Sequence, residues 1–120
     1  MKVLVCGGRD YNDRDAVFLA LDTLHASYPI TLIIAGGARG ADSLAVVWAE
    51  ARGVPTQVKP ADWKKHGRAA GHIRNKEMLN QNPDYVVAFP GGRGTANMMK
   101  ISREAGVTVW EPVRPPMVQQ

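Results

Sequence analysis

Short apolar runs alternate with amphipathic segments along most of the chain. The apolar runs lie at residues 2–5, 31–35, 54–58, 85–89 and 107–110, with Gly, Pro or polar residues close to their ends. Runs of this length are typical of buried β-strands. Between them, apolar residues recur at the three- and four-residue spacing of a helix face. The pattern therefore predicts five strands separated by helices.

The first two helices carry the clearest signals. Asn12 can cap the first helix, with Asp13 and Asp15 in its first turn, near the positive end of the helix dipole. Gly53 stands where a glycine ends the second helix. The expected apolar faces are Val17, Ala20, Leu21 and Leu24 in the first helix, and Leu44, Val47, Trp48 and Ala51 in the second. Residues 59–67 are expected to form a loop, and further helices are expected at residues 68–80 and 95–105.

The strands are almost uniformly apolar, which indicates a parallel sheet covered on both faces. We therefore predict an α/β fold with a single Rossmann-like, doubly wound parallel sheet and helices on both faces. Numbered along the chain, its five strands should follow the order 3-2-1-4-5. Pro55 cannot donate to a ladder, and this order places its strand at an edge. One domain is expected over residues 1–110, followed by a proline-rich tail at 111–120.

Composition narrows the choice of partners only slightly. Fifteen basic and eleven acidic residues give a net charge of +4, which suits anionic ligands of any size. Cys6 is the only cysteine, so no internal disulfide can form. His66 and His72 have no partners at metal-ligand spacing, so neither a metal nor a cofactor is expected. The apolar runs are too short for a membrane helix or a secretory signal, so we expect a cytoplasmic protein.

A Gly-Gly turn followed by arginine occurs three times, as VCGGRD (residues 5–10), IAGGARGAD (34–42) and FPGGRGTANM (89–98). The turns follow strands 1, 2 and 4, which are neighbours in the predicted order. Their carboxyl ends open into one crevice, where ligands of open α/β sheets bind. The ligand-binding residues predicted from these turns are Gly7, Gly8, Arg9, Gly36, Gly37, Arg39, Gly40, Asp42, Pro90, Gly91, Gly92, Arg93, Gly94 and Thr95.

Phosphate is the group that such turns suit best. Glycine lets the backbone approach a ligand closely, helix N-termini attract anions, and arginine offers forked donors. The plainer interpretation is that tight turns use glycine anyway and that the arginines are solvated. No turn is a Walker A loop, and none is a clean GxGxxG motif.

PGGRGT at residues 90–95 resembles the PGGxGT turn of the SLOG superfamily, named for DNA-processing A proteins and Lonely Guy phosphoribohydrolases. Together with CGGRD, GGARGAD, PADW and AGHIRNKEM, it makes the chain similar to the YspA-like branch over roughly residues 1–110. The resemblance implies a Rossmann-like fold and a nucleotide or nucleotide-derived ligand in the crevice. It also implies that self-association is common.

In the phosphoribohydrolase branch, an arginine and a glutamate carry hydrolysis of the N-glycosidic bond. Arg74 matches the arginine, but Met98 stands at the glutamate position. A thioether can neither activate water nor stabilise an oxocarbenium ion, which argues against hydrolase activity. The other candidates for a catalytic role are Asp42 and Glu77. Asp42 could instead accept a hydrogen bond from a ribose hydroxyl or satisfy its own helix end, and Glu77 could simply face solvent.

Three further groups have open roles. Arg74 and Asn75 could face the ligand, as the family match implies, or form ordinary helix contacts. Trp63 could stack on a base or cover the sheet edge. The basic run of residues 64–68 is either a solvated surface or a phosphate contact.

Three functions therefore stay open. The first is a nucleotide-binding sensor or sequestering domain. The second is a nucleoside-monophosphate phosphoribohydrolase-type enzyme, and the third is a protein that binds single-stranded DNA.

Overall fold

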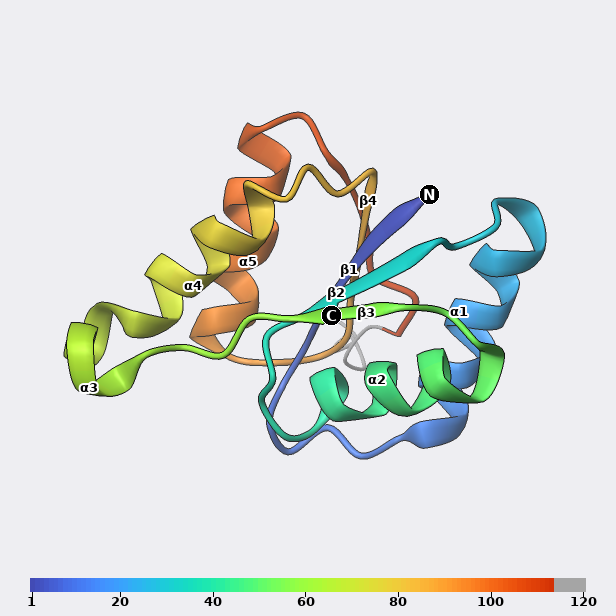
Figure 1. Ribbon diagram of the computed structural model, residues 1–120, viewed down its shortest axis with the longest axis horizontal. Coiled ribbons are helices and arrows are strands. Elements are labelled where there is room, and N and C mark those ends of the chain that lie inside the picture. The colour runs from blue at the N-terminus through green and yellow to red at the C-terminus, as the bar shows by residue number, and fades with distance from the viewer. Residues whose placement is uncertain (114–120) are drawn as a thin grey trace, which may run out of the picture.

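The computed structural model describes residues 1–113, which form one five-stranded parallel sheet covered by helices (Figure 1). The elements follow one another as β1 (Lys2–Cys6), α1 (Arg14–Ser27), β2 (Leu32–Ala35), α2 (Ala41–Arg52), β3 (Thr56–Val58), α3 (Trp63–His66), the 3₁₀ turn η1 (Gly67–Ala69), α4 (Ala70–Leu79), β4 (Tyr85–Ala88), α5 (Arg93–Glu104) and β5 (Thr108–Trp110). The predicted proline-rich tail lies mostly outside the described residues. Within residues 1–113, no helix combines the length and apolar character needed to cross a bilayer.

The sheet has the predicted strand order, β3-β2-β1-β4-β5, and every pair of neighbouring strands is parallel. This order puts β1 in the centre, between β2 and β4. β3 is an edge strand, as Pro55 required. Pro55 lies just before β3 and takes part in the sheet through its carbonyl, which accepts the amide of Ile33 (3.0 Å).

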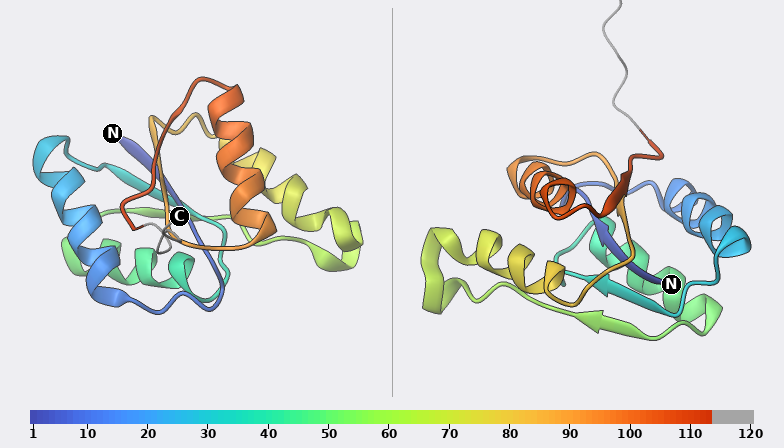
Figure 2. Two further views of the ribbon diagram at one scale, coloured as in Figure 1. Left: turned by 180° about the vertical axis from the view of Figure 1, so that it is seen from behind. Right: turned by 90° about the horizontal axis from the view of Figure 1, so that it is seen from above.

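Helices cover both faces of the sheet, which confirms the predicted α/β architecture. Figures 1 and 2 show α1 and α2 on one side of the strands, and α4 and α5 on the other. The central strand supplies both faces, because successive side chains of a strand point in opposite directions. Val3 and Val5 pack with α1 and α2, whereas Leu4 and Cys6 pack with α4 and α5.

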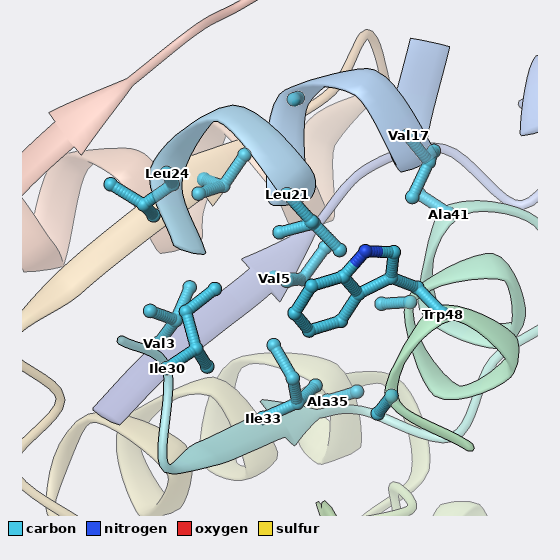
Figure 3. Close-up of a cluster of buried hydrophobic side chains, with 14 of the residues drawn as sticks. Val3, Val5, Val17, Leu21, Leu24, Ile30, Ile33, Ala35, Ala41 and Trp48 are labelled. Carbon is cyan, nitrogen blue, oxygen red and sulfur yellow. The ribbon is translucent and has the colours of Figure 1, made fainter. Parts of the chain in front are cut away.

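The larger of the two core clusters surrounds Trp48, the largest fully buried side chain (Figure 3). Its ring lies among side chains of α1, β1 and β2. Its indole N–H donates to Asp22 Oδ1 (2.9 Å), and Arg52 binds the same carboxylate through two hydrogen bonds. The polar end of the tryptophan is therefore satisfied. Truncation to alanine would cost about 3–5 kcal/mol of stability.

Two details of the first helices differ from prediction. Asp13, not Asn12, caps α1, and its Oδ1 accepts the amide of Ala16 (3.0 Å). The apolar face predicted for α1 is buried, but the face predicted for α2 is only partly right: Trp48 is buried and Leu44 packs against the core, whereas Val47 and Ala51 are exposed. The buried residues of α2 are Ala41, Asp42, Ala45, Trp48 and Ala49. Small alanines let α2 lie close to the sheet, and the larger Val47 stays 42% exposed.

The loop expected at residues 59–67 is partly helical. Asp62 caps a single turn, α3, by accepting the amide of Lys65 (3.1 Å) at its Oδ1. η1 then leads directly into α4. This arrangement carries Trp63 to a position against Gly71 of α4, where a Cβ added to the glycine would lie 3.6 Å from the indole ring.

Candidate functional site

Three turns come together at the carboxyl ends of β1, β2 and β4, and hydrogen bonds join them. The amide of Gly8 donates to the carbonyl of Pro90 (2.9 Å), and the amide of Ala41 donates to the carbonyl of Gly8 (3.2 Å). A cavity of about 590 Å³ opens beside them. It is lined by Cys6, Gly7, Gly8, Arg9, Ala38, Asp42, Trp63, Arg68, Gly71, His72, Arg74, Asn75, Met78, Gly92, Arg93, Gly94 and Thr95. We call it the main cavity.

Some of the predicted glycines hold the turns together instead of lining the main cavity. Gly40 has a φ of +82°, and an added Cβ would collide with the carbonyl of Gly8. A Cβ on Gly91 would collide with Thr95 Oγ1 and come within 2.7 Å of the Gly8 amide. Only glycine allows so close an approach of two backbones. These two positions therefore explain how three distant turns can form one surface.

The N-terminus of α5 lies in the wall of the main cavity. Its N-cap, Gly92, makes no side-chain capping bond, and the first amide bonded within the helix is that of Ala96, which donates to Gly92. In the described part of the chain, the amides of Arg93, Gly94 and Thr95 have no hydrogen-bond acceptor. These free amides stand at the positive end of the helix dipole, which favours an anion.

Four arginines line the main cavity: Arg9, Arg68, Arg74 and Arg93. Asp42 is the only acidic side chain in the same lining. Arg9 and Arg93 are exposed, and the Arg9 guanidinium lies 5.5 Å from the centre of the Trp63 ring. The charge of the cavity wall is therefore strongly positive, although the protein as a whole carries only +4.

Arg74 is half-buried and held in place from two sides. Its Nη1 donates to the carbonyl of Gly36 (2.6 Å), and its Nε donates to Asn75 Oδ1 (3.2 Å). Burial lowers the pKa of the guanidinium, and the nearby Asp42 opposes that shift. An arginine stays protonated in either case. Arg74 therefore presents a fixed positive charge to the cavity.

Asn75 lines the main cavity, and its side chain also makes contacts between helices. Its Nδ2 donates to the carbonyl of Gly94 (3.1 Å) and to Asn97 Oδ1 (3.0 Å). Its own oxygen accepts from Arg74. The side chain thus ties α4 to the first turns of α5, and it positions both Arg74 and the α5 N-terminus.

Asp42 is 6% exposed and lies in the first turn of α2. Its Oδ2 accepts the amide of Ala38 (3.2 Å). Burial raises the pKa of the carboxyl, while the Ala38 and Gly36 amides and the charges of Arg74 and Arg9 act to lower it. The local role expected for Asp42 is therefore present, and the residue also lines the cavity.

A second, smaller cavity of about 350 Å³ adjoins the first. It is lined by Arg9, Gly36, Gly37, Ala38, Arg39, Pro60, Ala61, Trp63 and Arg74. Arg9, Ala38, Trp63 and Arg74 belong to both linings. Arg39 reaches only the second cavity, and it forms an exposed ion pair with Asp10 (3.2 Å).

The structure thus brings together most, but not all, of the residues predicted for the site. Those in neither lining are Gly40, Pro90, Gly91 and Glu77. Glu77 is exposed, and Met98 is fully buried with Met78 under the sheet. The residues missed in the sequence are Cys6, Ala38, Arg68, Gly71, His72 and Met78. Four of these belong to η1 or α4. This stretch is only weakly amphipathic, so its sequence does not indicate which face of the helix lies toward the sheet. Arg68 had a signal, its place in the basic run.

The fold and the cavity define an α/β Rossmann-like domain whose candidate site lies at the carboxyl edge of a parallel sheet. Residues 1–66 match the family described as "YspA, cpYpsA-related SLOG family". The chain is also 41% identical to the "Gene 61 protein" of Mycobacterium phage D29, over 90% of this chain and 93% of the phage protein. The chain therefore belongs to this SLOG family, and its membership points to a nucleotide-related ligand-binding role.

Proposed function

We propose that the protein binds a nucleotide or nucleotide-derived ligand by its phosphate in the main cavity, as a sensor or sequestering domain. One observation carries the proposal. Turns from three neighbouring strands line a single cavity that contains the free end of α5 and four arginines. Its volume of about 590 Å³ lies within the range of small-molecule sites.

The phosphate is expected at the N-terminus of α5. The free amides of Arg93, Gly94 and Thr95 can each donate to a phosphate oxygen, and the helix dipole adds to the attraction. Arg93 belongs to the same turn, and Arg9 lines the same cavity. Both side chains are exposed, so they can move onto a ligand without losing a buried partner.

Binding without turnover fits the position of Met98. That residue occupies the place of the family glutamate and is fully buried in the apolar core cluster that contains Met78, Leu4 and Val86. A methionine there supplies neither a general base nor a negative charge. The site therefore has the donors to hold a phosphate but lacks the carboxylate that the hydrolase branch uses.

Isothermal titration calorimetry against AMP, ADP-ribose and cyclic AMP tests the proposal. At least one of these ligands should bind, and Arg93→Gln should weaken that binding by roughly tenfold or more, since one charge-assisted hydrogen bond contributes about 1.5–3 kcal/mol. Arg103→Gln is the matched control. It makes the same change near the other end of α5, where Arg103 pairs with Glu111 (3.1 Å). Silence across the panel with folded protein would refute the proposal.

A second function, hydrolysis of a nucleoside monophosphate, is favoured by one observation. Asp42 is a buried carboxylate in the same cavity wall as Arg74, so an acidic group is present although Met98 replaces the usual one. Incubation with nucleoside monophosphates, followed by chromatography for free base, decides between the two functions. Turnover that disappears in Asp42→Asn would establish the enzyme, and no release of base would leave binding alone.

A further inference from the structure

The Asp42 carboxylate has one oxygen in use and one available. Oδ2 accepts the amide of Ala38 (3.2 Å). The Gly36 amide also lies near enough to lower the pKa of the carboxyl. Within residues 1–113, however, no hydrogen bond of normal geometry reaches Oδ1, and no cation comes within ion-pair distance of the carboxylate. The side chain is more than nine-tenths buried, and what remains accessible belongs to the wall of the main cavity.

The closest side-chain donor does not bond to the free oxygen of Asp42. Arg74 lies close to Asp42, since a Cβ added to Gly36 would collide with Arg74 Nη1 and lie 2.9 Å from Asp42 Oδ2. Yet Arg74 directs its Nη1 to the carbonyl of Gly36 and its Nε to Asn75. An ionised carboxylate can only accept hydrogen bonds, and a bound ligand would displace water from Oδ1. A ligand that supplies an O–H donor at this point would keep that oxygen hydrogen-bonded.

The cavity wall contains three chemically different regions. The free end of α5 suits a phosphate, and the half-exposed Trp63 at the rim suits a base. Among the described residues of the lining, Asp42 carries the only carboxylate, which is a strong acceptor without a donor. In a nucleotide, the ribose joins the phosphate to the base, and its 2′ and 3′ hydroxyls are the donors of that middle part.

On this basis we propose that Asp42 binds the ribose hydroxyls, so that the site selects ligands with an intact ribose diol over their deoxy forms. The inference rests on the proposed function, because it assumes a nucleotide in the main cavity. A site built to bind a hydroxyl discriminates strongly against an analogue that lacks it, since its own polar group is then left unpaired.

The experiment compares AMP with its 2′-deoxy and 3′-deoxy forms by calorimetry. At least one deoxy compound should bind the wild-type protein tenfold or more weakly than AMP. In Asp42→Ala the affinities of the three compounds should fall within about threefold of one another. Glu50→Gln is the control, because it neutralises an exposed carboxylate on the same helix, outside both cavities, and it should keep the wild-type ratios.

The outcomes separate this inference from the proposed function. If AMP and both deoxy forms bind equally well, Asp42 does not bind the ribose, while nucleotide binding stands. If the discrimination survives in Asp42→Ala, another group causes it and the inference is wrong. If neither AMP nor its deoxy forms bind, the inference fails, and the proposed function is decided by ADP-ribose and cyclic AMP alone. If Asp42→Ala does not fold, the wild-type protein alone still tests the inference. Equal affinities of the wild type for AMP and both deoxy forms would overturn it without any variant.

Discussion

The amide of Gly8 donates a hydrogen bond to the carbonyl of Pro90 (2.9 Å), so the turn after β1 is joined to the turn after β4. The two residues are far apart in the chain but belong to adjacent strands. A contact between backbone groups, with no side chain involved, thus holds these two turns together beside the main cavity. Substitutions that separate these turns should affect folding and ligand binding together.

Gly91→Ala tests this coupling. The added Cβ would collide with Thr95 Oγ1 and lie 2.7 Å from the Gly8 amide, so it should force the two turns apart. We expect a loss of about 1–3 kcal/mol in the free energy of unfolding, measured by urea denaturation. Gly94→Ala, in the first turn of α5, is the control. A Cβ there meets no atom within 4 Å, and alanine favours the helix by about 0.5–1 kcal/mol. Equal effects of the two substitutions would contradict the prediction.

Much of the fold could be predicted because local and long-range signals agree. Five short apolar runs can pack on both faces only in a covered parallel sheet, and Pro55 excludes its strand from the centre. The sequence was less informative where two interpretations fit one pattern. In α2 the large apolar residues suggested one face, but the buried face is built on Ala41, Ala45 and Ala49, because close packing on the sheet favours small residues.

The candidate site was predictable where it consists of turns that follow strands, since strand order alone brings Arg9, Asp42 and Arg93 to one edge. The opposite wall of the site could not be predicted, because that wall depends on how α3 and α4 lie over the sheet. Asp62 was the missed signal, since a capping aspartate before Trp63 indicates a helical turn and not a loop. Asn75 was read as a ligand contact, and its engagement with Gly94 and Asn97 depends on tertiary packing that no local pattern encodes.

Arg74→Lys should show that the guanidinium fork, not only its charge, is needed. Arg74 donates to Gly36 from one nitrogen and to Asn75 from another, and a lysine ammonium cannot reproduce both directions. We expect the free energy of unfolding to fall by about 1–2 kcal/mol, because the carbonyl or the amide oxygen loses its donor. Thermal unfolding measures this change. The comparison is Arg68→Lys, at an exposed arginine of the same cavity that makes no hydrogen bond or ion pair within residues 1–113. Equal melting temperatures for the two variants would refute it.

The ionised Asp42 carboxylate should lower the free energy of unfolding at neutral pH, compared with a neutral side chain at the same position. Burial raises the pKa of the Asp42 carboxyl, so the folded protein holds this proton more tightly than the unfolded chain. Between the ordinary and the raised pKa, stability therefore falls as pH rises. Asp42→Asn should be more stable than wild type at pH 7, and its advantage should shrink as pH falls toward the ordinary aspartate pKa of about 3.9. Urea denaturation from pH 4 to pH 7.5 measures the difference, and an advantage that does not change with pH would contradict this account.

Cys6 should be chemically inert although it lines the main cavity. Burial, together with the charges of Asp42 and Glu111, raises the pKa of the thiol to about 12. At pH 8 only about one thiol in ten thousand is then a thiolate, and the thiolate is the reactive form. Native protein should react with a disulfide reagent far more slowly than protein unfolded in urea, where the thiol regains a pKa near 8.5. Rapid labelling of the native state would show that the cavity floor is more open than the structure indicates.

Trp63 should contribute to the binding of a nucleotide but not to that of a phosphate alone. Its indole is 50% exposed at the rim shared by both cavities, so a base can stack on it without displacing core side chains. Stacking of a base on an aromatic ring contributes about 1–3 kcal/mol, so Trp63→Ala should weaken AMP binding roughly tenfold or more.

Two comparisons distinguish stacking from an indirect effect on Arg9, whose guanidinium lies 5.5 Å from the Trp63 ring. Trp63→Phe keeps an aromatic face for both the base and the guanidinium, so it should retain most of the affinity for AMP. Inorganic pyrophosphate has no base, and its affinity should change by less than about twofold in Trp63→Ala. If pyrophosphate loses as much affinity as AMP, the tryptophan acts by holding Arg9 in place, and the base must bind elsewhere in the cavity.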